Sequence, residues 1–167
     1  MEVRFFQGAP GFVRILFEES LEKGEVMLDY LIPIHPKMVH FPVALFITAF
    51  FFDVLSLLFR KEGLHKAAVR IYVFAALMTP VVVRTGLWEE ERLHLGHPLL
   101  EKHRVFALWT MWVSLMSLPV LWFIKQRSKK FFRTFFVILL ITVAVFVTLA
   151  AHNGGRLVYE YGTGVEK

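Results

Sequence analysis

Four long apolar segments dominate the hydrophobic pattern of this chain, and most charged residues lie between them. Each segment has about the 20 residues that an α-helix needs to cross the hydrocarbon core of a bilayer. Helices are expected because the hydrocarbon offers no water to hydrogen-bond exposed backbone groups. The predicted spans are residues 38–59, 67–88, 105–124 and 135–151. The pattern therefore predicts an all-α membrane protein whose four transmembrane helices form an up-down bundle.

A shorter periodic segment precedes the first span. From Pro10 onward, the stretch GFVRILFEESLEKG combines apolar and charged residues with the period of an amphipathic helix, and Gly24 ends it. We predict that this helix lies along the membrane surface. The expected organisation is an N-terminal tail, residues 1–34, followed by a four-helix membrane domain, residues 35–167.

The basic residues orient the four predicted spans. Lysines and arginines are concentrated in the loops after the first and third spans, whereas the tail before His35 is net acidic. Short loops rich in Lys and Arg favour the cytoplasmic side of the membrane. We therefore expect a multi-pass protein of the cell's inner (plasma) membrane with both termini on the outer side.

The chain contains no cysteine and seven histidines. The lack of cysteine excludes disulfides, iron–sulfur clusters, thiolate copper sites and covalent c-type haem, and leaves imidazole-ligated metals and b-type haem. In the predicted topology only His65 faces the cytoplasm. The histidines at the outer end are His35, His40, His94, His97, His103 and His152. Of these, His35, His94 and His97 are interpreted as solvated.

The remaining outer histidines are candidate cofactor ligands. Imidazole is the commonest protein ligand for transition metals, and facing helices of a bundle can hold a cofactor between them. We predict His40 and His103 as axial ligands of one b-type haem, with His152 as an alternative. Arg84 or Arg156 would bind a haem propionate. Zinc or copper is the alternative metal, and a polar role at the membrane interface is the alternative for each histidine.

Asp53 is an acidic residue inside the first span. It lies about 20 Å along a helix from His40, toward the predicted cytoplasmic side. An acid at this depth must be paired or neutral, and Arg70 is its predicted partner. A salt bridge or hydrogen bond between helices is favoured over a proton-handling site. Pro42 is placed in the first turn of the span, where its missing N–H costs little.

The segments HPKMVHFPVALF, residues 35–46, and GGRLVYEYGTGV, residues 154–165, resemble the two ends of a known family. This is the bacterial predicted-membrane-protein family known as domain of unknown function twenty-two thirty-one. The resemblance covers residues 33–165, and Tyr161 stands where the family often has a histidine. The matching positions are His35, Pro36, His40, Phe41, Pro42, Asp53, His103, Gly154, Gly155, Leu157, Val158, Tyr159, Gly162 and Gly164.

Members of this family also occur fused to Rieske or cytochrome c domains, so the resemblance implies a place in electron transfer. We expect a b-type cytochrome-like carrier between the quinone pool or a membrane enzyme and an external redox protein, and not a stand-alone enzyme. The alternative is a non-redox accessory or scaffold subunit of a larger membrane complex, with a structural zinc or copper site or none. The lipid bilayer is a partner in both hypotheses, and no nucleic-acid partner is expected.

Overall fold

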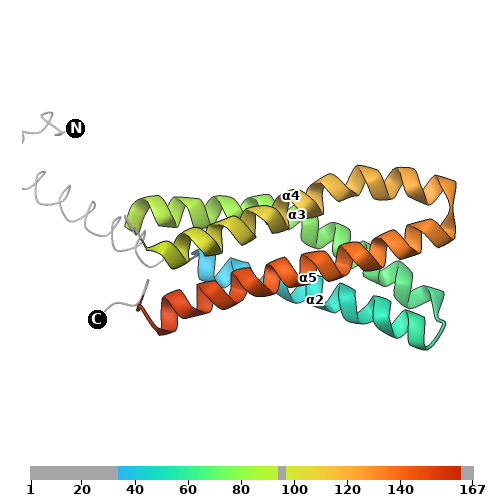
Figure 1. The fold of residues 1–167 in the computed structure, drawn as a ribbon, viewed down its shortest axis with the longest axis horizontal. Helices are drawn as coiled ribbons and strands as arrows, with labels where there is room; N and C mark the ends of the chain where they lie inside the picture. The colour runs from blue at the N-terminus through green and yellow to red at the C-terminus, as the bar shows by residue number, and fades with distance from the viewer. Residues whose placement is uncertain (1–33, 94–96, 163–167) are drawn as a thin grey trace, which may run out of the picture. The chain divides into compact units, whose positions relative to one another are not determined.

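The structure, a computed structural model, describes residues 34–93 and 97–162. These residues form four α-helices: α2 (Ile34–Leu58), α3 (Glu62–Leu93), α4 (Pro98–Arg127) and α5 (Lys129–Tyr159) (Figure 1). All four are long and apolar enough to cross a membrane. The predicted all-α, four-helix architecture is therefore confirmed. The amphipathic helix predicted after Pro10 lies outside the described residues.

Consecutive helices run in opposite directions along the bundle (Figure 1). The turn between α2 and α3 and the turn between α4 and α5 lie at the same end, which we call the turn end. The start of α2, the end of α3, the start of α4 and the end of α5 lie at the opposite end, which we call the histidine end. Residues far apart in the chain, such as His35 and His103, thereby reach the same level.

Short capping motifs close the turn end. The backbone N–H of Ser128 donates to the Ile124 oxygen over 3.2 Å, and its side chain accepts an N–H from the first turn of α5. At the end of α2, Arg60 adopts a left-handed φ of 54° and Lys61 N–H donates to the Ser56 oxygen over 3.2 Å, as in a Schellman motif. Because capping groups rather than hydropathy end the helices, α3, α4 and α5 extend beyond their predicted spans at both ends, whereas α2 begins before its span and ends one residue short of it.

Three of the four helices contain an internal proline. The three are Pro42 in α2, Pro80 in α3 and Pro119 in α4. The placement of Pro42 in the first turn is wrong, because α2 begins eight residues before it. A proline leaves the carbonyl four residues earlier without its usual N–H donor. In α3 the Thr79 hydroxyl donates to that carbonyl, Ala76 O, over 2.7 Å, and so replaces the donor that Pro80 lacks.

Tyr72 of α3 lies at the centre of the bundle and has no exposed surface. Its ring centroid is 5.5 Å from that of Phe46 in α2 and 5.5 Å from that of Phe136 in α5. Its hydroxyl oxygen is 2.8 Å from the Oγ atom of Ser117 in α4. Lipid is as apolar as the core, so close packing and hydrogen bonds of this kind hold transmembrane helices together. Tyr72 therefore joins all four helices.

Candidate functional site

Two imidazole rings lie in a T-shaped contact at the histidine end. His35, in the first turn of α2, and His103, near the start of α4, have ring centroids 6.3 Å apart and ring planes at 80°. The Nδ1 atom of His35 lies 3.1 Å from the Val82 oxygen in α3, and that of His103 lies 2.8 Å from the Ala150 oxygen in α5. Two helices thus supply the rings, and the other two supply the carbonyls that hold them.

These hydrogen bonds define the tautomer of both rings. A carbonyl oxygen can only accept, and the Thr85 hydroxyl, 3.2 Å from Nδ1 of His35, donates to the same Val82 oxygen, so we assign the donated proton to Nδ1 of both His35 and His103. In the neutral ring, Nε2 then keeps its lone pair, which is the form of imidazole that ligates metals. A carbonyl bound to the other ring nitrogen is also the usual outer partner of a metal-ligating histidine. Each ring of the pair therefore has an Nε2 lone pair that is available to bind a metal.

Two glycines make room for the two rings. A Cβ atom placed on Gly86 of α3 would lie 2.7 Å from Cε1 of His35, and one placed on Gly154 of α5 would lie 3.0 Å from Cε1 of His103. Both distances are shorter than an ordinary van der Waals contact, so each ring rests against bare backbone. A Cβ on the neighbouring Gly155 would meet nothing within 4 Å. The position of each imidazole thus depends on one particular glycine.

Gly86→Ala is expected to displace the His35 ring and break its hydrogen bond to Val82. The added methyl group and the ring cannot occupy the same space, and losing one hydrogen bond lowers stability by about 1 kcal/mol. The ¹⁵N chemical shifts of the ring nitrogens measure this change, because they report tautomer and hydrogen bonding. Gly155→Ala, which adds the same methyl group in open space, should leave them unchanged. If the His35 signals were unaltered in Gly86→Ala, the His35 ring would not pack against Gly86 as described.

Of the histidines predicted as ligands, only His103 belongs to this pair. His40 and His152 are exposed on the outside of α2 and α5. The structure brings His103 together with His35, which the sequence interpretation had treated as solvated. His40 follows His35 by five residues, so on a helix it points about 140° away. His35 and His40 therefore cannot point into the bundle at the same time.

His97, at the start of α4, has a capping role. Its Nδ1 atom accepts the Leu99 N–H over 3.1 Å, which satisfies a free donor of the first helical turn. Its ring centroid lies 4.3 Å from that of Tyr161. Tyr161 is the residue that stands where the family that the sequence resembles often has a histidine. His94 lies outside the described residues.

The predicted propionate-binding arginines lie toward the histidine end without hydrogen bonds to the two imidazoles. Arg84 is exposed. Arg156 makes two hydrogen bonds of 2.8 Å to Glu160, and these bonds lower the pKa of the Glu160 carboxyl. Arg104 pairs with Glu90 over 2.8 Å and links α4 to α3. Arg156 is therefore already engaged, whereas the guanidinium of Arg84 is exposed.

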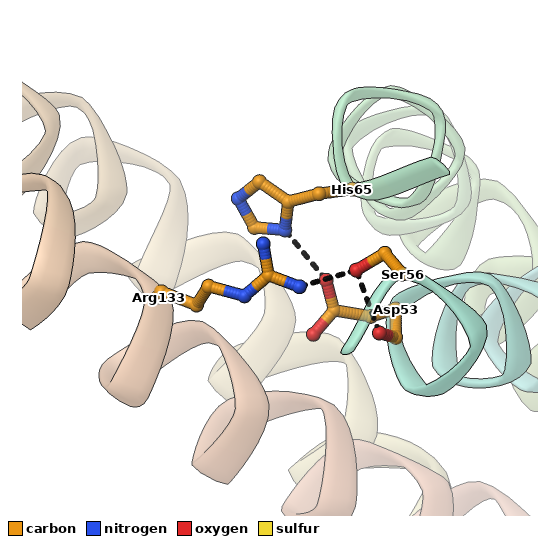
Figure 2. A network of polar contacts seen from close by, with 4 residues as sticks. All are labelled: Asp53, Ser56, His65 and Arg133. Carbon is orange, nitrogen blue, oxygen red and sulfur yellow. Dashed lines mark hydrogen bonds and ion pairs between the residues drawn. The ribbon is translucent and has the colours of Figure 1, made fainter. Parts of the chain in front are cut away.

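A second polar cluster lies toward the turn end (Figure 2). Asp53 of α2 is 1% exposed, and its Oδ1 atom lies 2.5 Å from Nδ1 of His65 in α3. The hydroxyl of Ser56 donates to the Asp53 backbone oxygen over 2.7 Å and accepts from Arg133 of α5. The predicted Asp53–Arg70 pair is wrong, because Arg70 is exposed and His65 takes its place. The sequence interpretation missed His65 because it placed this residue in a loop.

Two polar atoms of this cluster are buried without a hydrogen-bond partner among the described residues. They are Oδ2 of Asp53 and Nε of Arg133, one an acceptor and the other a donor. The edges of Phe132 and Phe136 enclose His65, with ring centroids 5.8 and 5.7 Å away. An ionisable group in such apolar surroundings inside a membrane is costly and marks a candidate functional site.

A comparison with known families places the chain. The family model described as predicted membrane protein (DUF2231) matches residues 31–167, which include both polar sites. The chain belongs to the DUF2231 family. No curated protein and no solved structure matches it. The match confirms the family resemblance, and together with the four apolar helices it identifies this DUF2231 protein as a multi-pass membrane protein.

The kind of metal site that the histidine end can form depends on how many ligating side chains it supplies. In the part of this DUF2231 protein that the structure describes, no three or more His, Asp or Glu side chains are grouped so that they could hold a metal ion. A protein zinc site uses three or four ligands, so His35 and His103 alone do not complete one. Two imidazoles do suffice for a metal whose other ligands arrive with a cofactor.

Proposed function

We propose that this DUF2231 protein is a b-type cytochrome-like electron carrier that binds one haem between His35 and His103. The observation that carries the proposal is the 6.3 Å separation between the ring centroids of His35 in α2 and His103 in α4. Two imidazoles that bind one metal from opposite sides have centroids roughly 6 Å apart, since a metal–nitrogen bond is about 2 Å and each centroid lies roughly 1 Å beyond its nitrogen. The observed spacing fits this arrangement.

The donor set supports the same cofactor. A porphyrin brings four nitrogen ligands of its own, so the protein need supply only the axial ones. The Val82 and Ala150 carbonyls accept from Nδ1 and make each ring a more basic ligand through Nε2. When bound, the haem supplies a one-electron Fe(III)/Fe(II) couple. Arg84 is the proposed partner of a propionate, because its guanidinium is exposed and Arg156 is bonded to Glu160.

The place of the carrier in the cell is part of the proposal. The basic residues flanking the turn end favour the cytoplasm for that end, so the histidine end and both termini would face outward from the plasma membrane. A haem at this level would exchange electrons with an external redox protein on one side and with the quinone pool or a membrane enzyme on the other.

A non-redox accessory or scaffold subunit is the second candidate function. It is favoured by the observation that His35 and His103 already hydrogen-bond to carbonyls of neighbouring helices and so clasp the bundle without a cofactor. In that case a structural zinc or copper ion at this pair would need further ligands from another subunit of the complex.

Absorption spectroscopy and iron analysis distinguish the two candidates. The full chain is produced in haem-replete cells, purified in detergent, and examined in its oxidised and chemically reduced forms. The carrier is expected to show a Soret band, bands that sharpen on reduction, and one haem iron per chain. A scaffold is colourless. Protein free of iron and of a Soret band would refute the haem proposal.

A further inference from the structure

Buried polar side chains recur along the interior of the bundle between its two ends. In α3 and α4 they recur every seven residues, and a seven-residue step is about two helical turns, so each set lies on one face. The α3 set is His65, Tyr72 and Thr79, and the α4 set is Thr110 and Ser117 with Ser114 between them. All of these side chains are at most 9% exposed. They form a line, which we call the polar line, through the interior of an otherwise apolar bundle.

The polar line is joined across helices at its centre. Tyr72 and Ser117 are linked by the 2.8 Å hydrogen bond between α3 and α4. Ser117 donates its own hydrogen to the Ser114 oxygen over 2.7 Å, so the Tyr72 hydroxyl must be the donor to Ser117. The result is two successive donors that end on the Ser114 backbone oxygen, so onward transfer requires the Ser117 hydroxyl to turn from this oxygen to a water molecule. A hydroxyl can accept a proton on an oxygen lone pair while it releases the proton that it carries, and it is unchanged afterwards.

The polar line begins at the Asp53–His65 pair of the turn end. Here Oδ2 of Asp53 and Nε of Arg133 are buried and have no partner among the described residues. The carboxylate of Asp53 and the guanidinium of Arg133 have opposite charges, so the cluster favours a neutral guest over an ion. Water fits both atoms, because it can donate to Oδ2 and accept from Nε.

Packing alone explains only part of the polar line. A buried hydroxyl that bonds to its own helix, such as Thr110 to the Phe106 oxygen over 2.8 Å, is a common feature of transmembrane helices. It does not account for an unpartnered carboxylate oxygen on a residue that is 1% exposed.

We propose that the polar line is a proton path through the bundle, loaded at Asp53–His65 and carried across the Tyr72–Ser117 hydrogen bond. Successive levels are about 10 Å apart along a helix, which is farther than one water molecule can bridge, so the proposed path requires a file of several water molecules in each gap. The Phe136 ring packs against both His65 and Tyr72, with centroids 5.7 and 5.5 Å away, so it must swing aside for water to fill the first gap. Ionisable residues inside membranes commonly serve such proton relays. The proposal does not depend on haem.

Proton flux into liposomes tests the path. The purified chain is reconstituted with a pH-sensitive dye inside, and a potassium diffusion potential drives protons inward. Tyr72→Phe removes only the linking hydroxyl. It is expected to slow the flux by about tenfold or more, as for one hydrogen bond lost from a rate-limiting step. Thr142→Val is the matched control, because Thr142 is half-buried outside the polar line and its hydroxyl bonds to the Ile138 oxygen of its own helix over 3.0 Å.

The result expected from the control is a flux equal to that of the unaltered protein. The proposal is overturned if liposomes with the unaltered protein take up protons no faster than empty liposomes. It is also overturned if Tyr72→Phe conducts protons as fast as the unaltered protein. Equal losses in Tyr72→Phe and Thr142→Val would also overturn it, since the flux would then depend on general packing. The haem content of the same samples shows separately whether the proposed electron carrier stands.

Discussion

His65→Leu is expected to lower the free energy of unfolding of the bundle by about 3 kcal/mol. The substitution removes the hydrogen-bond partner of Oδ1 of Asp53, whose Oδ2 is already without one among the described residues. A polar group left unpaired in the interior costs about 1–3 kcal/mol, and a broken buried ion pair about 3–5 kcal/mol. The expected loss of about 3 kcal/mol is the upper end of the first range and the lower end of the second. Reversible unfolding in mixed micelles, titrated with a denaturing detergent, measures it.

Two variants separate this effect from a general response to leucine. Lys66→Leu introduces the same side chain at the neighbouring exposed position and should change stability by no more than about 0.5 kcal/mol. The double variant Asp53→Leu/His65→Leu should recover most of the loss, because apolar residues often replace a buried pair without cost. If His65→Leu were as stable as Lys66→Leu, the Asp53–His65 contact would contribute nothing to the fold.

The four helices could be predicted because hydropathy is the strongest signal in a membrane sequence, but their ends could not. The first predicted span begins at residue 38, whereas α2 begins at Ile34. These four residues matter, because they bring His35 into the helix and give it a defined face. The turn after α2 is closed by Arg60 in a left-handed conformation, which a non-glycine residue seldom adopts and hydropathy cannot indicate.

The helical spacing of His35 and His40 relative to Asp53 indicates which of the two histidines points into the bundle. Eighteen residues separate His35 from Asp53, which is five turns of about 3.6 residues, so both lie on one face of α2. Asp53 marks the interior, since a carboxylate avoids lipid, and this favours His35 as the inward ring. The contacts of Gly86 and Gly154 with the imidazoles had no comparable signal, because they depend on how separate helices cross.

Hydroxyl groups show why the inner face of such helices is hard to predict. Thr110 and Thr142 both bond to the carbonyl four residues earlier, yet Thr110 is buried and Thr142 is only half-buried. Lipid and core are equally apolar, so a hydrophobic pattern does not distinguish them. The distinguishing feature is the seven-residue repeat: Thr110 follows His103 and precedes Ser117 at that spacing, whereas the position seven residues after Thr142 is Leu149.

His35→Ala and His103→Ala are each expected to abolish haem binding. Loss of an outer partner of a metal ligand typically lowers affinity by about 10–100-fold, and loss of the ligand itself should exceed that. The change is measured as the Soret absorbance and iron content of purified protein. His40→Ala and His152→Ala are matched controls, because both rings are exposed at the same end of the bundle. They should bind haem as the unaltered protein does.

A loss of haem could also arise because a variant fails to fold, and imidazole separates the two causes. In a folded His103→Ala variant the missing ring leaves a space beside Gly154, and free imidazole added to the buffer should enter it and restore the Soret band. An unfolded chain would not respond. If His40→Ala lost the Soret band while His35→Ala kept it, the haem would be bound by the pair first predicted from the sequence. The rings of His35 and His103 would then serve only to hold the helices together.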